Sequence, residues 1–360
     1  MILTVVGARP NFVKMAPVVS EILRRRLPHL LVHTGQHYDE KMSAIFFDQL
    51  QMPRPDINLN IGSGSQADQT ARIMMSFEPI CTQYKPRLVM VGGDVNSTLA
   101  CALTAAKLMI PVAHVESGLR SFDRAMPEEI NRILTDHLSD LLFVTEASGL
   151  ENLQREGITQ EKVHFVGNTM IDSLFRFLEQ ALTLQPWQNY ALEPGKYGLV
   201  TFHRPSNVDS EDQVRVLAAA LDRVGERLPL LFPIHPRTLH QHGDLWKAVR
   251  NIKLVEPLGY LEFLGLMAKA AVVITDSGGI QEETTALGVR CVTVRHNTER
   301  PITVTQGTNR LVEANPVQIA EAVFSANERP FQRPALWDGH AAKRLIDVVE
   351  GWYRATEENI

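Results

Sequence analysis

Short apolar runs rich in valine, isoleucine and leucine recur along this chain and constrain its fold more than any other feature. Each run ends in glycine or a polar cluster and is followed by a helical pattern, which is typical of parallel strands buried on both faces. A first series of strands is predicted at 2–7, 30–34, 87–92, 111–115, 141–144 and 163–166. A second series is predicted at 197–202, 229–234, 252–255, 271–275 and 290–294.

The two series predict an α/β protein with two Rossmann-like, doubly wound domains. Between the series lie a helical stretch from Asn168 to Leu184 and a proline-containing segment at 185–195, which indicate a domain connection. A last helical pattern at 340–356 can pack back on either domain.

Composition and charge exclude several classes of protein. The chain has 360 residues, 44% of them hydrophobic and 21% charged, and this length buries a core without disulfides or structural metals. Three scattered cysteines with no C-x-x-C pair favour reduced thiols and a cytoplasmic protein. The net charge of -5 gives no general attraction to nucleic acid or anionic lipid. No window approaches the ~20 apolar residues of a membrane span, and residues 1–7 are predicted as a strand rather than a signal peptide.

Polar side chains follow many of the predicted strands at the point where each strand ends. In doubly wound sheets, ligands bind outside the carboxyl ends of the strands. These clusters therefore predict one ligand site in a cleft between the two domains. They contain Arg9, Lys14, Gln36, His37, Asp94, Glu116, His203, His235 and the run Asp276–Gly279.

The run Ser277-Gly278-Gly279 follows a predicted strand and opens a helix. Free N–H groups and the helix dipole at such a turn suit a diphosphate, although a plain capped helix start, with Asp276 or Ser277 as the cap, is the alternative. Glu283, one turn further, can accept hydrogen bonds from ribose hydroxyls or serve only as a favourable acid in a first turn. No G-x-G-x-x-G follows the first strand, which argues against NAD.

Several arginines and one lysine are candidates for binding phosphate oxygens. Arg9 and Lys14 follow the first strand. A solvated side chain is the usual alternative for each candidate, and it is least expected for Arg9, which lies between Ala8 and Pro10 at a strand end. The dense basic run Arg24–Arg26 is expected to be a solvated helix end. The further candidates are Arg132, Arg300 and Arg310.

Three carboxylates and one histidine are candidates for acid–base chemistry. Asp94 and Glu116 each follow or end an apolar strand, Glu128 opens a helix, and His203 ends the first strand of the second domain. Each can be structural, as a turn residue, a helix-terminal acid or a satisfied polar group. Together they supply the several acid–base groups that proton transfer at opposite faces of a carbon requires. The histidines near His235 have no carboxylate at ligand spacing, so we expect no metal.

Over nearly its whole length the chain resembles the non-hydrolysing UDP-N-acetylglucosamine 2-epimerases. The resemblance lies in ordered motifs distributed along both predicted domains. The matching stretches are Gly7-Ala8-Arg9-Pro10, Lys14-Met15-Ala16-Pro17, Thr34-Gly35-Gln36-His37, Gly93-Asp94, His114 to Arg120, Pro127 to Arg132, Gly167-Asn168-Thr169, Thr275 to Glu283, and Thr298-Glu299-Arg300-Pro301.

The resemblance implies a GT-B-like fold, with two Rossmann-like domains facing a cleft and a C-terminal helix that crosses back to the N-terminal domain. The implied domains are 1–167 with 344–360, and 168–343 for UDP binding. The implied reaction interconverts UDP-N-acetylglucosamine and UDP-N-acetylmannosamine through elimination of UDP to 2-acetamidoglucal and its re-addition. It implies no cofactor, a homodimer, and a product used for surface polysaccharide.

The family motifs also imply roles for particular residues. The positions that match catalytic groups are Asp94, Glu116, Glu128 and His203. The matching substrate-binding positions are Arg9, Lys14, Ser277, Gly278, Gly279, Glu283 and Arg310, with Phe263 near the uracil, and Arg132 and His235 complete the predicted set. The sequence does not decide which carboxylate removes the proton and which returns it.

This sequence departs from the family pattern in places. The stretch Tyr38–Ser43 lacks the glutamine-rich pattern of relatives with allosteric activation, so we expect no such activation. Val95–Thr98 replaces a threonine run, Leu258 replaces a glutamine, and the segment at 120–127 is shorter than in the enterobacterial type. These differences leave a UDP-diacetamido uronic acid open as the substrate. A GT-B glycosyltransferase, a hydrolytic epimerase and a non-catalytic UDP-sugar sensor are the alternative functions.

Overall fold

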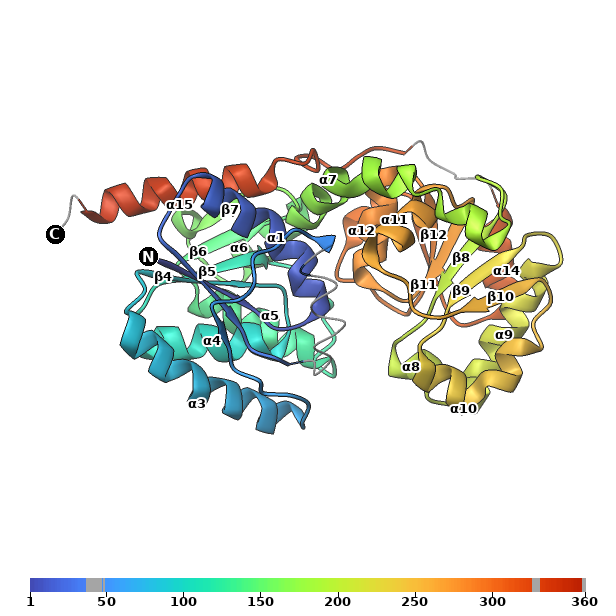
Figure 1. Cartoon of the computed structure of the whole chain (residues 1–360), viewed down its shortest axis with the longest axis horizontal. Coiled ribbons are helices and arrows are strands. Elements are labelled where there is room, and N and C mark those ends of the chain that lie inside the picture. Colours follow the sequence, from blue (N-terminus) through green and yellow to red (C-terminus); the bar gives the residue numbers. More distant parts are fainter. Residues whose placement is uncertain (37–46, 48, 326–330, 358–360) are drawn as a thin grey trace. The chain divides into compact units, whose positions relative to one another are not determined.

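A computed structural model describes residues 1–36, 47, 49–325 and 331–357 and divides the chain into two compact units (Figure 1). Unit 1 contains Met1–Ser173 and Ala335–Ile360, and unit 2 contains Leu174–Pro334. Each unit is built on one parallel sheet with helices between successive strands. The predicted α/β class with two Rossmann-like sheets is confirmed.

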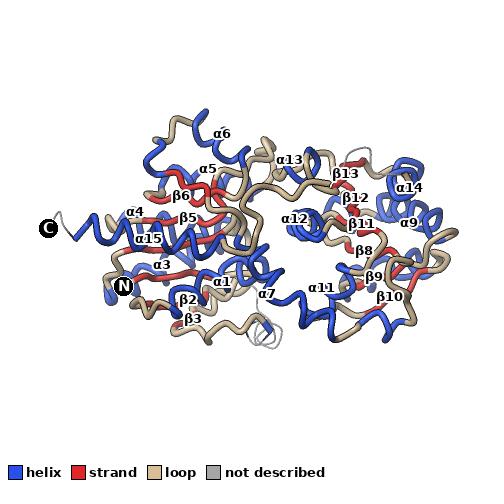
Figure 2. Tube along the Cα trace, turned by 90° about the horizontal axis from the view of Figure 1, so that it is seen from above, coloured by secondary structure: helices blue, strands red, loops and turns tan. Residues whose placement is uncertain are grey.

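The sheet of unit 1 has the strand order β3-β2-β1-β4-β5-β6-β7, and all of its pairs are parallel (Figure 2). The order reverses direction between β1 and β4, the kind of position at which doubly wound sheets bind ligands. The two-residue strand β3 was not predicted because it is too short to show a pattern. The strands are β1 Ile2–Val6, β2 His29–His33, β3 Ile57–Asn58, β4 Leu88–Gly92, β5 Val112–Ser117, β6 Leu141–Val144 and β7 Val163–Phe165.

Helices cover both faces of this sheet. α3, α4 and α5 pack side by side on one face, below the sheet in Figure 1, and α1 packs with α15 above it. The core under α3 contains Leu3, Val91 and Phe77, all buried. The helices are α1 Arg9–Arg24, α3 Gln66–Tyr84, α4 Asn96–Lys107, α5 Pro127–Leu138, α6 Ala147–Arg155 and α15 Ala341–Glu357, and α7 Thr169–Thr183 leads into unit 2.

The sheet of unit 2 has the order β10-β9-β8-β11-β12-β13. Its core includes an aromatic cluster in which Phe232 meets Trp246 edge-on at 5.3 Å between ring centroids. The strands are β8 Gly198–Thr201, β9 Leu230–Pro233, β10 Ile252–Val255, β11 Val272–Thr275, β12 Arg290–Val294 and β13 Asn309–Val312. The helices are α8 Pro205–Val208, α9 Glu211–Gly225, α10 Pro236–Lys247, α11 Tyr260–Ala268, α12 Gly278–Leu287, α13 Pro301–Thr305 and α14 Pro316–Phe324.

The chain returns to unit 1 at Ala335, earlier than the expected residue 344. The reason is that residues before 344 already bond to the rest of unit 1. The Trp337 indole donates to the Thr145 carbonyl at 2.9 Å, and the amide of Ala342 donates to the Asp172 carboxylate at 2.7 Å. The first boundary falls at Ser173, inside α7, rather than after residue 167.

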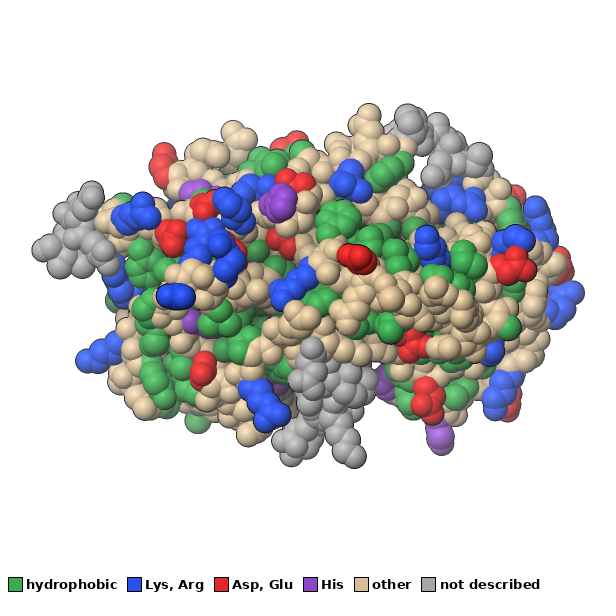
Figure 3. Space-filling model, turned by 45° about the horizontal axis from the view of Figure 1, so that its top comes forward, with side chains coloured by type: hydrophobic (Ala, Val, Ile, Leu, Met, Phe, Trp, Pro, Cys, Tyr) green, Lys and Arg blue, Asp and Glu red, His purple; other side chains and the backbone are tan. Residues whose placement is uncertain are grey.

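The expectation that Arg24–Arg26 is a solvated helix end is wrong for Arg25. Its guanidinium lies 2.7 Å from carboxylate oxygens of Glu21 on α1 and of Asp347 and Glu350 on α15, and its side chain is only 12% exposed. Arg24 is 64% exposed and pairs with Glu21 alone among the described residues. In Figure 3, basic and acidic side chains intermingle where α1 and α15 reach the surface. Arg25 therefore ties the C-terminal helix to α1.

No helix in the described part of the chain combines the length and the apolar character that crossing a bilayer requires.

We expect Arg25→Ala to lower the stability of unit 1 by about 1 kcal/mol, because it leaves three carboxylates without their shared cation. Thermal denaturation followed by circular dichroism measures the change as a fall in Tm. Arg24→Ala is the matched control and should leave Tm unchanged. Equal Tm values for the two variants would contradict the role of Arg25.

Candidate active site

In unit 1, two candidate acids stand at the carboxyl ends of neighbouring strands. Asp94 follows β4 after Gly93, and Glu116 lies near the end of β5. Strands β4 and β5 are paired in register, with Gly92 opposite Val115. The sheet therefore brings these two acids to one edge, beside the reversal of strand order at β1 and β4.

The backbone of Glu116 adopts an uncommon conformation. Its φ is 72°, in the left-handed region, and the β5–β6 register shifts between Val115 and Ser117. A non-glycine residue held there is strained, and such strain is often found at functional sites. The side chain is buried and accepts a hydrogen bond from Lys14 Nζ at 2.7 Å. Lys14, expected to bind phosphate, is thus placed as the counter-ion of Glu116.

Arg132 holds the second acid. Its buried guanidinium donates through Nη1 to Asp94 Oδ2 at 2.5 Å and through Nη2 to Glu129 Oε2 at 2.7 Å. Arg132 was predicted to bind substrate, but these contacts hold Asp94 in position. Because this charged and buried donor fixes Oδ2 of Asp94, the carboxylate is held in a defined position.

The two glutamates that open α5 differ in their exposure to solvent and in their contacts. Glu128 is exposed, whereas Glu129 is 1% exposed and accepts from the backbone amides of Ser121 at 2.9 Å and Phe122 at 2.8 Å. Burial raises the pKa of Glu129, but these amides and Arg132 outweigh it and hold the pKa below its usual value. Glu129 is therefore the structural acid, and Glu128 is the one that a ligand can reach.

A buried histidine and aspartate, which the sequence analysis did not select, connect the two acid-bearing loops. His114 Nε2 donates to the Gly93 carbonyl at 2.8 Å, and its Nδ1 lies 2.6 Å from Asp136 Oδ1. Asp136 Oδ2 accepts from the amide of Gly118 at 3.1 Å. Gly93 precedes Asp94 and Gly118 follows Glu116 by two residues, so this pair links the positions of both acids. The available signal was a histidine in the middle of an apolar strand.

We expect Glu129→Gln to lower the free energy of unfolding by about 3 kcal/mol, because the buried Arg132 loses one of its countercharges. This loss should appear as a clear fall in Tm. Glu128→Gln is the neighbouring control and should leave Tm unchanged, since its side chain is exposed. Thermal denaturation of both variants tests the assignment. A larger loss in Glu128→Gln than in Glu129→Gln would contradict it.

In unit 2, His203 follows β8 and faces Asp276, which follows β11. His203 Nδ1 lies 2.8 Å from Asp276 Oδ1, and the histidine side chain is 57% exposed while the aspartate is fully buried. Asp276 does not cap α12, since the N-cap position is Ser277. Burial raises the pKa of Asp276, but hydrogen bonds from His203, Arg204 and Asn207 hold it below the usual value.

The predicted diphosphate turn lies at the start of α12. Ser277, Gly278 and Gly279 are half-buried. Ser277 is the N-cap residue of α12, and its side chain makes no capping hydrogen bond in the described structure. A Cβ on Gly278 would lie 2.5 Å from Arg300 Nη1 and 2.7 Å from Glu299 Oε1, so a larger residue there would have to displace this buried pair. Arg300 itself pairs with Glu282 at 2.8 Å and with Glu299. Its charge is therefore neutralised inside the protein.

Glu283 lies one turn further along α12 and is buried. The Tyr260 hydroxyl on α11 donates to its Oε1 at 3.3 Å. Burial raises the pKa of Glu283 to about 8, and Glu282 adds to the rise while Tyr260 opposes it. Phe263 stands on α11 one turn after Tyr260 and is half-buried, so α11 places both aromatic side chains on one segment.

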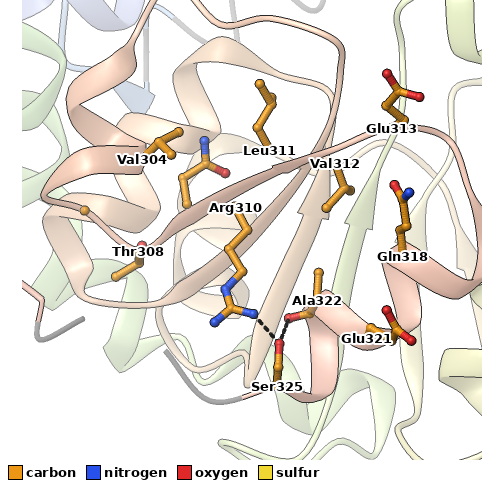
Figure 4. A pocket seen from close by; sticks show the side chains of 12 residues that line it. Val304, Thr308, Arg310, Leu311, Val312, Glu313, Gln318, Glu321, Ala322 and Ser325 are labelled. Atoms are coloured by element: carbon orange, nitrogen blue, oxygen red, sulfur yellow. Dashed lines mark hydrogen bonds between the residues drawn. The ribbon is translucent and has the colours of Figure 1, made fainter. Parts of the chain in front are cut away.

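Arg310, a predicted substrate-binding residue on β13, directs its side chain to Ser325 after α14 rather than to the start of α12. Val292 of β12 lies opposite both Ile274 of β11 and Arg310 of β13. Arg310 is therefore level with Ile274, one residue before the end of β11. It points toward Ser325, to whose hydroxyl it donates, in a pocket of about 740 Å³ beside α14 (Figure 4).

For two further predicted residues the structure gives only their place in the fold. His235 follows β9 and is exposed. The backbone of Arg9 begins α1, but its side chain and the stretch Tyr38–Ser43 lie outside the described part of the structure. The described residues contain no cluster of three or more histidine, cysteine or acidic side chains suited to a metal.

Comparison with known proteins identifies the family. The family model described as UDP-N-acetylglucosamine 2-epimerase matches residues 21–350. This chain belongs to that family. It is 43% identical over 359 residues to the UDP-N-acetylglucosamine 2-epimerase of Methanococcus maripaludis, with 96% of this chain and 97% of the relative covered. The resemblance stated from the motifs is confirmed.

Two other relatives from this 2-epimerase family bear on the substrate. The chain is 42% identical over 354 residues to the UDP-2,3-diacetamido-2,3-dideoxy-D-glucuronate 2-epimerase of Pseudomonas aeruginosa, covering 97% of this chain and 99% of the relative. A crystal structure of the Methanocaldococcus jannaschii UDP-GlcNAc 2-epimerase in complex with UDP-GlcNAc and UDP matches with a TM-score of 0.88 at 40% identity. That match covers 97% of this chain and 99% of the other.

Proposed function

We propose that this protein is an isomerase that interconverts UDP-N-acetylglucosamine and UDP-N-acetylmannosamine by inverting carbon 2. Membership of the family and the similarity to an enzyme crystallised with UDP-GlcNAc and UDP support the substrate class. The observation that carries the proposal is the pair of carboxylates at one sheet edge, Asp94 and Glu116, each held by a buried cation.

The chemistry needs no oxidation. A base takes the proton from carbon 2 while the bond from carbon 1 to the β-phosphate oxygen breaks, and its electron pair leaves with UDP. The electrons of the broken C–H bond form the C1–C2 double bond of 2-acetamidoglucal. UDP then adds back to carbon 1 while a proton is delivered to the opposite face of carbon 2. Acid–base groups and stabilisation of the leaving diphosphate are the two requirements of this route.

The acid–base groups in the proposal are Asp94, Glu116, Glu128 and His203. Arg132 and Lys14 fix the first two, Glu128 is reachable from solvent, and His203 is more than half exposed. A side chain held by a buried partner keeps the geometry that proton transfer requires.

UDP binding is assigned to the start of α12 and its surroundings. The N–H groups at Gly278 and Gly279 suit the diphosphate because the helix dipole favours negative charge there. The Ser277 amide donates to Thr275 Oγ1 at 3.0 Å, so Ser277 is assigned to the diphosphate through its hydroxyl. Glu283 receives the ribose hydroxyls and Phe263 packs near the uracil, while Arg9 and His235 are retained as phosphate contacts. Lys14 is retained as well, because its ammonium has three N–H donors and the bond to Glu116 uses one of them. Arg310 is not retained, because it bonds to Ser325.

We also propose that the enzyme is cytoplasmic, works as a homodimer and supplies a surface polysaccharide. Three free, buried cysteines are consistent with a reducing compartment. Exposed apolar side chains on α3 and α5, Met75 at 74% and Ile130 and Leu134 at 45% each, offer surface for a second copy. Light scattering after size-exclusion chromatography measures the molecular mass of the protein in solution and so tests the homodimer.

Incubation with UDP-N-acetylglucosamine in deuterated water, without acceptor, tests the function. Proton NMR should show the manno epimer with deuterium at carbon 2, because the removed proton exchanges with solvent. Asp94→Asn and His203→Ala should still bind UDP but epimerise about 10²-fold or more slowly. Free N-acetylmannosamine would indicate a hydrolytic enzyme, and full activity in both variants would contradict the site.

The same assay, run with each candidate UDP-sugar, shows which substrate the enzyme prefers. UDP-2,3-diacetamido-2,3-dideoxy-glucuronate is the second candidate, because the relative of that name is nearly as similar to this chain as the N-acetylglucosamine enzyme. A higher kcat/KM for the uronic acid would reassign the substrate without changing the reaction.

Binding of a UDP-sugar should tighten as pH rises, because Glu283 must ionise to accept hydroxyl donors. With a pKa of about 8 its carboxyl is mostly protonated at neutral pH, so affinity rises up to that pH and then levels off. From about pH 6.5 to about pH 8.5 we expect roughly 20-fold tighter binding.

Calorimetry with UDP-N-acetylglucosamine in the inactive Asp94→Asn background measures this dependence. Glu283→Gln is the control, and its affinity should no longer change with pH. This result separates the contribution of Glu283 from those of nearby Glu282 and Tyr260 and of the exposed histidines. A pH-independent affinity in the background protein would contradict the ribose assignment.

A further inference from the structure

The carboxylate of Asp276 is surrounded by hydrogen-bond donors. Its Oδ2 accepts from the amides of His203 at 3.1 Å and Arg204 at 3.0 Å and from Asn207 Nδ2 at 3.0 Å. Its Oδ1 lies 2.8 Å from His203 Nδ1. Asp276 is 0% exposed, so water does not compete for these contacts. The carboxylate is therefore fixed in both position and orientation.

This arrangement decides which nitrogen of His203 carries the proton. An ionised carboxylate can only accept hydrogen bonds, so the facing Nδ1 must donate. The donors around Asp276 favour its ionised form, and its pKa is held below the usual value for this reason. In the neutral ring the proton then sits on Nδ1, and Nε2 carries the lone pair.

The same residue connects His203 to the diphosphate turn. β8 and β11 are neighbours in register, with Thr201 opposite Thr275, so the loops that follow them leave the sheet together. Arg204 Nε also donates to the carbonyl of Asp276 at 3.0 Å. Ser277 is the next residue, so a shift of Asp276 would move His203 relative to the start of α12.

We propose that Asp276 is the positioning residue of His203, which holds the ring as the Nδ1–H tautomer and offers Nε2 to the substrate. The part of His203 in catalysis rests on the proposed function, whereas the tautomer follows from the contacts alone. Asp276 is fully buried, so in this proposal it acts through His203 rather than on the substrate itself.

Asp276→Asn tests this inference because the surrounding donors dictate how the new amide is oriented. The Arg204 amide and Asn207 Nδ2 donate to Oδ2 alone, whereas the His203 amide is shared, at 3.1 Å from Oδ2 and 3.2 Å from Oδ1. The two donors specific to Oδ2 require the amide oxygen at that position. The amide NH₂ group then points at His203 Nδ1, which must accept. The ring is forced into the Nε2–H tautomer, and Nε2 can no longer accept a proton.

Nitrogen-15 NMR of the full chain, labelled on histidine, reads the tautomer directly at a pH where the ring is neutral. The signals of His203 are assigned by their loss in His203→Gln. The wild type should show a protonated Nδ1 and an unprotonated Nε2, and Asp276→Asn should show the reverse. In the epimerase assay, Asp276→Asn should lower kcat by about 10²-fold or more while KM changes by less than about threefold.

Asn207→Ala is the matched structural control. It removes one donor to Asp276 but keeps the carboxylate, so the Nδ1–H tautomer should persist and kcat should fall by less than about threefold even where Tm drops. This control separates the choice of tautomer from a general loosening of the loop.

An Nε2–H tautomer in the wild type would overturn the inference, even if Asp276→Asn does not fold. Full activity in Asp276→Asn with a reversed tautomer would overturn the positioning role. A wild type that shows the Nδ1–H tautomer but no epimerisation would refute the proposed function alone, because the NMR measurement uses no substrate.

Discussion

The buried ion pair between Lys14 and Glu116 is the contact on which the acid-bearing edge of unit 1 depends. A carboxylate taken out of water is costly unless a charged donor accompanies it. Glu116 is 3% exposed and adopts a strained backbone conformation, and the Lys14 ammonium 2.7 Å away is the charged donor that accompanies its carboxylate. The pairing places an acid–base group with a fixed direction at the end of β5.

The same physical rule governs the other candidate groups. Arg132 holds Asp94, and Asp276 holds His203, with each holding residue almost completely buried. In both pairs the more exposed member is the candidate acid–base group, and the buried member fixes its orientation. We infer that proton transfer at carbon 2 uses groups whose geometry is set before the substrate arrives, which avoids reorganisation during the reaction.

Sequence patterns predicted the parts that depend on periodicity. The apolar runs predicted most strands, and the polar clusters after them contained Asp94, Glu116 and His203. The patterns failed where a role depends on contacts between distant segments: Arg132 looked like a phosphate ligand, Asp276 like a helix cap, and Arg25 like a solvated side chain. Strand β13 and the placement of Arg310 were missed because four residues of mixed polarity carry no clear period.

The central claim is that carbon 2 is inverted by elimination and re-addition of UDP, with no oxidation. The most direct measurement supplies the protein with UDP and 2-acetamidoglucal alone and follows the mixture by phosphorus and proton NMR. Because each step is reversible, UDP-N-acetylglucosamine and UDP-N-acetylmannosamine should both form. If neither forms with protein that epimerises UDP-N-acetylglucosamine under the same conditions, the elimination mechanism is contradicted.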